Sequence, residues 1–299
     1  MQLEQTCWRG VQVEHPADWE LSFASGLGKP GKLVFSDRFY QRIIVTWKSL
    51  KYLPDTEMVL KPHRITKKGQ DIEVTDLKDA PEPWKGVVRV APEHTVTHAG
   101  RFHKDRRLLL EVTFVWPGER DCELEREIIA SINLQPQPSD CETRHWRASG
   151  MDLDIDSTYE LQSSSTKVGL VKWTFKENPD AKRSVVVERF AMPDTWLKGS
   201  VRDWIVRELP IGFKPIRQDY STVNRHAGEY LTSHHKASFI AALCGKAEVN
   251  SVTAWMCPVE NRLYRVTVCD VTTEIELPWP DGLVIRCCKP TPQPSSSVV

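Results

Sequence analysis

Residues 8–13 read Trp8-Arg9-Gly10-Val11-Gln12-Val13, and Trp19-Glu20-Leu21 follows them closely. Related residues occur in the second half of the chain: Trp146-Arg147, Gly150-Met151-Asp152-Leu153 and Tyr159-Glu160-Leu161. Two more segments return in the same order, Pro54-Asp55-Thr56 as Pro193-Asp194-Thr195 and Arg107-Leu108-Leu109 as Arg262-Leu263-Tyr264. Ordered anchors of this kind are typical of an internal repeat, so the sequence predicts two copies of one module.

Apolar and polar residues alternate through much of both copies, with many β-branched and aromatic residues, which is typical of β-strands. Each copy also contains a helical pattern. Asp121 is the expected N-cap of the first helix, and Asp194 or Thr195 is the expected N-cap of a second helix that ends before Pro210. The sequence therefore predicts an α+β fold, in which two tandem copies of an antiparallel-sheet module carry flanking helices.

The boundaries of the modules follow from composition. The segment Gln135-Pro136-Gln137-Pro138-Ser139-Asp140 is rich in proline and lacks a core pattern, so it is expected to be a linker. We predict a first module over residues 1–138 and a second over residues 139–290. Residues 291–299 contain two prolines and three consecutive serines, and we expect them to form a disordered tail.

The charge balance of the chain is not typical of a nucleic-acid-binding protein. The chain has 40 Lys and Arg and 40 Asp and Glu, so its formal net charge is zero, whereas nucleic-acid-binding proteins usually carry a basic excess. Its first residues lack a basic start followed by an apolar run, and no stretch is long and apolar enough to span a membrane. We therefore expect a cytoplasmic protein whose eight cysteines are reduced.

The segment His15-Pro16-Ala17-Asp18-Trp19-Glu20-Leu21 and the order of strands and helices around it resemble the Mog1/PsbP-like α/β/α module. This resemblance implies a small binding or assembly factor without catalytic activity. Members of that superfamily act on GTPases or on photosystem and envelope complexes. The resemblance assigns no functional residue to this chain.

Gly26-Leu27-Gly28-Lys29-Pro30-Gly31 has the glycine spacing of a dinucleotide-binding loop. Such a loop binds phosphate only when a helix follows it, because the amides at the helix N-terminus hold the anion. Here the following residues, Leu33-Val34-Phe35, have a strand pattern. The glycines are therefore predicted to form a hairpin loop and not a nucleotide site.

The histidines and cysteines of the second half do not predict a metal site or any cofactor. His234 and His235 are adjacent and would point to opposite faces of a strand, and His226 lies eight positions before His234. The cysteines near the C-terminus are expected to be buried free thiols. Two alternatives stay open: Cys287 and Cys288 are redox-active or lie close to Cys257, and a cysteine and a histidine form a catalytic pair.

Four of the eleven tryptophans have no counterpart in the other copy, and a basic run occurs near residue 104. Tryptophan is favoured where partners bind, and basic side chains bind acidic ones. The candidate partner surface consists of Trp84, Arg101, Lys104, Arg106, Trp116, Trp196 and Trp279.

The sequence favours a non-catalytic protein-binding or complex-assembly factor built from two fused modules. Its partner would be another protein, and the sequence leaves the oligomeric state open. The alternative is a Cys- or His-dependent enzyme, similar to a hydrolase, with its site in the groove between the modules.

Overall fold

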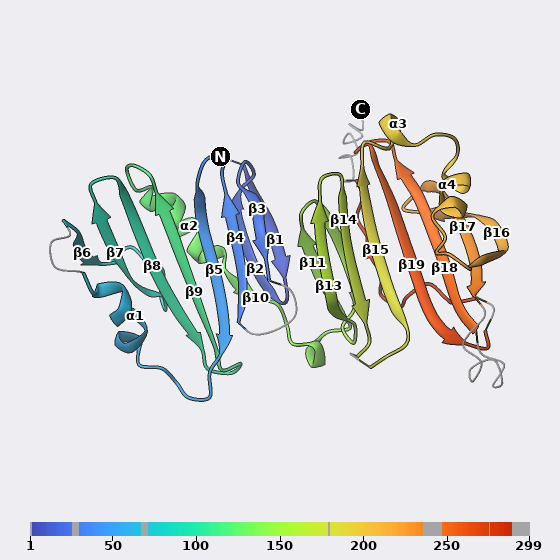
Figure 1. The fold of residues 1–299 in the computed structure, drawn as a ribbon. Helices are drawn as coiled ribbons and strands as arrows, with labels where there is room; N and C mark the ends of the chain where they lie inside the picture. The colour runs from blue at the N-terminus through green and yellow to red at the C-terminus, as the bar shows by residue number, and fades with distance from the viewer. Residues whose placement is uncertain are drawn as a thin grey trace, which may run out of the picture. The chain divides into compact units, whose positions relative to one another are not determined.

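The computed structural model describes residues 2–25, 30–66, 71–178, 180–235, 247–274 and 276–288, with the side chains of Thr56 and Glu57 excepted. The chain divides into two compact units, shown in Figure 1. The first comprises Met1–Pro136 and Arg147–Ser149, and the second comprises Gln137–Trp146 and Gly150–Val299. The division at Pro136 falls within the Pro-rich segment Gln135–Asp140.

The first unit contains a seven-stranded antiparallel sheet. Its strands, from one edge to the other, are β3 (Glu20–Ala24), β4 (Gly31–Ser36), β5 (Gln41–Ser49), β9 (Leu108–Trp116), β8 (His94–His103), β7 (Lys85–Ala91) and β6 (Glu73–Asp76). Most neighbours are consecutive in the chain, and β5 pairs with β9, with Val45 opposite Val112. Side chains alternate between the two faces, so Leu110, Val112 and Phe114 of β9 are buried on one face.

Three shorter strands of this unit pair in the order β10-β2-β1, with bounds Asn133–Leu134, Val11–Pro16 and Leu3–Trp8. Arg9 and Gly10 connect β1 to β2, and both have positive φ angles, 52° and 80°. Two residues of this conformation form the tight hairpin turn whose twist matches that of the strands. Ser149 and Gly150, between β11 and β12, repeat this geometry with φ angles of 50° and 70°.

Two helices belong to the first unit. α2 (Cys122–Ser131) lies beside β2, and the carboxylate of its N-cap Asp121 accepts a hydrogen bond from the amide of Leu124 at 2.9 Å. The sequence-predicted cap is therefore confirmed. α1 (Thr56–Arg64) packs on β7 and β8 and contains Pro62 (Figure 1).

The second unit contains another seven-stranded antiparallel sheet, with the same order of strands. They are β13 (Glu160–Lys167), β14 (Leu170–Lys176), β15 (Ser184–Ala191), β19 (Arg262–Thr272), β18 (Ala247–Cys257), β17 (His226–His235) and β16 (Lys214–Val223). Shorter elements are a 3-10 turn (Pro138–Asp140), β11 (Thr143–Ala148), β12 (Met151–Asp156) and β20 (Val284–Ile285). β20 pairs with β12, with Leu153 opposite Ile285.

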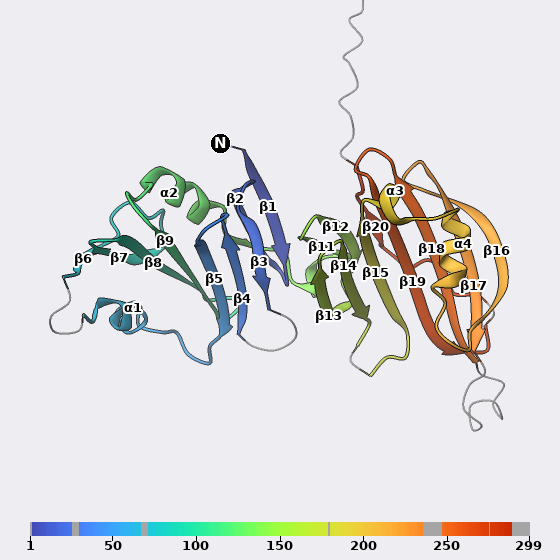
Figure 2. The same ribbon diagram turned by 45° about the horizontal axis from the view of Figure 1, so that its top comes forward.

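The single helix predicted after Asp194 is two short ones, α3 (Pro193–Trp196) and α4 (Val201–Arg207). Gly199 separates them with a φ of 89°, and the hydroxyl of Ser200 caps α4 by accepting a hydrogen bond from the amide of Asp203. α4 packs on β17 and β18 (Figure 2), where Trp204 and Ile205 join Leu231 and Leu263 in the core.

The predicted α+β class with flanking helices in two copies is wrong. Of the described residues, 54% are in strands and 12% in helices, so the chain is mostly antiparallel β-sheet. The helices α1, α2, α3 and α4 have nine, ten, four and seven residues. Helices of this length pack mainly on one or two strands each: α1 on β7 and β8, α2 on β2, and α4 on β17 and β18.

Two sequence predictions fall outside the described residues: the loop around Gly26 and Gly28, and the tail 291–299. Gly31 is described and begins β4, as the hairpin prediction requires. A Cβ atom there would lie 1.9 Å from ring atom Cε2 of Trp47, so glycine permits close packing. Within the described part of the chain, every helix is too short or too polar to cross a membrane.

A buried polar network joins α2 to the sheet of the first unit. The carboxylate of Glu125 is 1% exposed and accepts hydrogen bonds from the indole of Trp116 at 2.5 Å and from Arg120 at 2.7 Å. Trp116 in turn lies edge-on to Trp19, with ring centroids 6.0 Å apart. The buried carboxylate of Glu125 therefore pairs with a partly buried cation and also accepts from a buried N–H group.

We expect Glu125→Ala to lower the free energy of unfolding by about 3 kcal/mol, because it leaves Arg120 and the Trp116 indole without their acceptor. Glu127→Ala, on the exposed side of the same helix, is the matched control and should change stability by less than about 0.5 kcal/mol. Urea unfolding of both variants measures the difference. Equal effects of the two substitutions would show that the network does not stabilise the unit.

Two stacked imidazole rings hold α1 against β8. His63 and His98 have ring centroids 3.9 Å apart, and Nδ1 of His98 lies 2.9 Å from the hydroxyl of Thr113. Burial lowers the pKa of His98 from 6.5 to about 4, and the nearby His63 and Arg89 act in the same direction. Burial also lowers the pKa of His63. The folded unit therefore favours neutral rings.

Because the folded pKa of His98 lies below the unfolded value, its contribution to stability is present above about pH 6.5 and is lost as the pH falls toward about 4. We expect His98→Gln to lose less stability than the wild type between pH 7 and pH 5 in urea unfolding. His94→Gln, at the exposed start of the same strand, should retain the wild-type loss. If His98→Gln lost as much stability as the wild type between pH 7 and pH 5, this assignment would be contradicted.

Candidate metal centre

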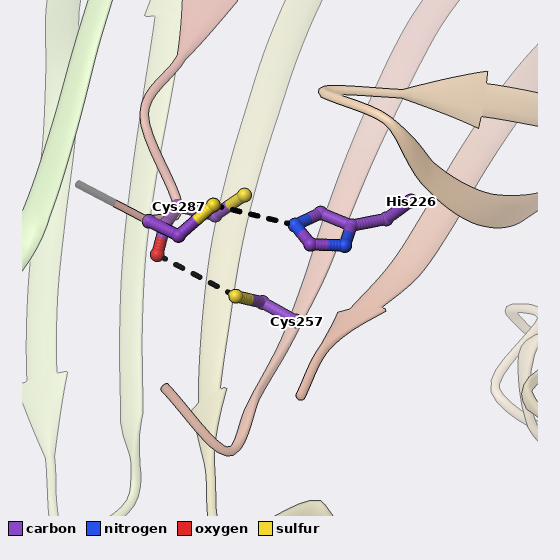
Figure 3. A group of neighbouring side chains, drawn as sticks. His226, Cys257 and Cys287 are labelled. Carbon is purple, nitrogen blue, oxygen red and sulfur yellow. Dashed lines mark hydrogen bonds between the residues drawn. The ribbon is translucent and has the colours of Figure 1, made fainter. Parts of the chain in front are cut away.

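Four side chains of the second unit that can bind a metal converge at one end of its sheet. They are His226, Cys257, Cys287 and Cys288, and we call them the thiol cluster. One ligand atom from each, an imidazole nitrogen or a thiol sulfur, lies within 4.8 Å of all the others. Figure 3 shows the imidazole and the sulfurs pointing toward one another.

The pairing of β17 with β18 places two of these residues together. The strands are antiparallel, and Gly228 lies opposite Trp255, so the beginning of β17 lies beside the end of β18. His226 is the first residue of β17 and Cys257 is the last of β18. The histidine and the cysteine are 31 positions apart in the chain but adjacent at this end of the sheet.

The other two thiols arrive with the C-terminal segment. β20 pairs with β12, and Arg286, next along the chain, forms ion pairs with Asp152 and Asp154. Cys287 and Cys288 follow this anchor outside any strand, in a bend at Cys288. On a strand two adjacent thiols would point apart; the bend instead lets both reach the cluster, close to Cys257.

Backbone amides favour a charged sulfur at Cys257. Pro258 follows it and starts a turn, and the amides of Val259 and Glu260 form hydrogen bonds to the thiol group. Burial raises the pKa of Cys257, and these two amides oppose that rise. A thiolate with N–H donors aimed at it is typical of metal-bound cysteine.

Side-chain donors surround Cys287 in the same way. The carboxamide of Asn224 donates to its sulfur at 3.6 Å and also to the carbonyl of Ile285. The buried indole N–H of Trp255 also favours the thiolate of Cys287. Burial nevertheless raises the pKa of Cys287, and so does the neighbouring Cys288. A positive ion would offset this cost of burial.

The remaining contacts close the cluster. The thiol of Cys257 donates to the carbonyl of Cys287 at 3.6 Å, and the sulfur of Cys288 lies 3.6 Å from Nε2 of His226. Three sulfurs and one imidazole are a usual ligand set for zinc in a tetrahedral site. Zinc bonds of about 2.0–2.3 Å separate such ligands by about 3.5–3.8 Å, so small rotations would complete the shell.

His234 and His235 lie away from this cluster, at the far end of β17. Eight residues of strand separate His234 from His226 by roughly 26 Å, so the two cannot bind one ion. His235 instead lies 3.9 Å from Glu248 on β18. The spacing of the three histidines predicts no metal site, and the cluster that the structure brings together takes only His226 from them. No short Cys-x-x-Cys or His-x-x-x-His spacing links its four members, because they come from segments that meet only in the folded chain.

The residues of the predicted partner surface do not form one continuous exposed surface. Trp84 and Trp116 are buried in the core of the first unit. Arg101 lies near the end of β8, opposite Leu110 of β9, and Lys104 and Arg106 occupy the following hairpin turn, where Lys104 is exposed. In the second unit Trp196 and Trp279 are 38% and 39% exposed, and each indole donates to a backbone carbonyl, of Ala191 and Leu283.

No protein-family model matches the chain, and no curated protein matches it. Among solved structures from Pseudomonas aeruginosa, the apo immunity protein TplEi of T6SS has a TM-score of 0.42 and 9% identity, covering 97% of this chain and 99% of that chain. TplEi complexed with "L" peptide has a TM-score of 0.35 and 10% identity, covering 96% and 99%.

A third structure, the protein of unknown function PA94, described as a putative regulator, has a TM-score of 0.25 and 16% identity, covering 44% of this chain and 83% of that chain. Similarities of this degree carry no argument about the function of the present chain. The resemblance to Mog1/PsbP-like modules stays a prediction.

Proposed function

We propose that the second unit binds one zinc ion through the thiol cluster, and that the chain is a non-catalytic protein-binding factor in which this ion has a structural role. The observation that carries the metal proposal is the convergence of three sulfurs and one imidazole within 4.8 Å, from segments far apart in the sequence. Thiolates are soft ligands, which selects zinc or copper(I) over magnesium or calcium.

The ligand count supports a structural role. Zinc in proteins is usually tetrahedral, and a catalytic zinc keeps one position for water or substrate. Here the protein itself supplies four ligands. The ion would join the ends of β17 and β18 to the C-terminal segment, which β20 holds through two paired residues.

The enzyme alternative would use His226 as a base for the thiol of Cys288, which lies 3.6 Å away. Such a pair requires N–H donors that stabilise charge developing on the substrate. The donors of this cluster are directed at the sulfurs of Cys257 and Cys287 instead. The arrangement therefore favours metal binding over catalysis.

The protein-binding part of the proposal rests on the first unit. Met58 and Ile65 lie on or next to the outward side of α1, and Tyr52 and Leu53 precede the helix. These four large apolar side chains are between 62% and 83% exposed. Exposed apolar side chains gathered in a short stretch mark a surface where another protein binds.

We expect metal-free protein to take up one zinc ion per chain and to bind Co²⁺ with the intense visible absorption of tetrahedral thiolate coordination. A hundredfold excess of zinc over its dissociation constant should raise the free energy of unfolding by about 2.7 kcal/mol. Cys257→Ser should abolish stoichiometric binding, because it removes one of three thiolates.

Cys122→Ser is the matched control for this experiment, since Cys122 is an exposed thiol at the start of α2. It should bind zinc as the wild type does. Protein that binds no zinc, or that binds it equally well after Cys257→Ser, would rule out the proposed centre.

For the partner surface, we expect the double variant Tyr52→Ser, Met58→Ser to lose a protein that the wild type retains on an affinity resin. Both side chains are exposed, so thermal unfolding should change little. Val168→Ser, in an exposed turn of the second unit, is the control and should retain that protein. Equal retention by all three chains would contradict this assignment.

A further inference from the structure

We infer that the thiol cluster is also an oxidation site, in which a hydroperoxide oxidises Cys288 and Cys257 then forms a disulfide with it. The inference deepens the proposed function, because the same sulfurs would hold the zinc ion. The thiol chemistry itself needs only Cys288 and Cys257, and it can therefore be tested with or without metal.

Cys288 is the sulfur that an oxidant reaches. Cys257 and Cys287 are fully buried, whereas Cys288 is partly exposed. Peroxides oxidise the thiols that they can reach, so exposure selects Cys288 among the three cysteines of the cluster.

Geometry decides which partner Cys288 takes. A disulfide usually joins residues with Cα atoms about 4.4–6.8 Å apart, and adjacent residues are only about 3.8 Å apart across a trans peptide. A Cys287–Cys288 disulfide is therefore strained. Cys257 belongs to another segment, and its ligand atom lies within 4.8 Å of that of Cys288. The sulfur of Cys287 instead accepts a hydrogen bond from the carboxamide of Asn224.

The reaction has two balanced steps. The sulfur of Cys288 attacks hydrogen peroxide, the O–O bond breaks, and the thiol proton leaves with the departing oxygen, so the products are a sulfenic acid and water. The thiol of Cys257 then displaces the sulfenic hydroxyl group, which leaves as water while the S–S bond forms. Overall, two thiols are oxidised, one peroxide is reduced, and two water molecules result.

Oxidation has a direct consequence for the metal. After the disulfide forms, only Cys287 and His226 of the four ligands are free to bind zinc, so the ion dissociates. The end of β18 nevertheless remains tied to the C-terminal segment, now by a covalent bond. The cluster would hold the same two segments together under both reducing and oxidising conditions.

The test treats the full chain with equimolar hydrogen peroxide, both metal-free and zinc-loaded, and maps disulfides by mass spectrometry without reduction. We expect a Cys257–Cys288 disulfide in both samples. In the zinc-loaded sample a coloured chelator should detect release of one zinc ion per disulfide. Cys288→Ser should abolish the disulfide, and Cys122→Ser should retain it.

The outcomes separate the two proposals. A Cys257–Cys288 disulfide in a chain that binds no zinc supports the oxidation site and rules out the metal centre. Zinc binding without this disulfide, or disulfides that join Cys244 or Cys269 instead, overturns the oxidation site and leaves the metal centre standing. Because disulfide mapping and zinc binding of the wild type decide these outcomes, a failure of Cys288→Ser to fold does not affect the result.

Discussion

Antiparallel pairing of β17 with β18 is the constraint on which the candidate site depends. Gly228 lies opposite Trp255, and this register brings the first residue of β17 beside the last residue of β18. A shift by one residue would turn every side chain of β17 to the other face of the sheet, and His226 would leave the cluster. The core side chains Leu231 and Val252 hold the register, because both must stay buried.

A turn or a helix cap can be predicted from a few adjacent residues. The length of a helix cannot, where neighbouring residues favour both continuing and ending it. Arg9-Gly10 and Asp121 determine a hairpin turn and a helix cap through the backbone of their immediate neighbours. The stretch after Asp194 has a helical apolar pattern throughout, but Gly199 and Ser200 interrupt it. The spacing of apolar residues does not indicate that the helix is divided at these two residues.

The candidate site was harder to predict because its residues meet only through tertiary structure. The spacing of His226, His234 and His235 describes one strand, and that strand alone binds nothing. Cys287 and Cys288 both reach the cluster because the chain bends after Arg286, which is held by its ion pair with Asp152. The residues around the two cysteines do not predict this bend. Trp116 is also buried and not part of an exposed partner surface, and its indole donates to Glu125 of the following helix, a pairing that the sequence does not indicate.

The attachment of β20 also has a mechanical consequence. Two residues pair it with β12, in an antiparallel ladder at the margin of the unit. Cys287 and Cys288 follow β20 in the chain, so a pulling force applied beyond Cys288 would reach the thiol cluster before it reached this ladder. The bonds among Cys257, Cys287 and Cys288, whether through an ion or a disulfide, would therefore carry the load first, and β20 would be loaded only after they broke.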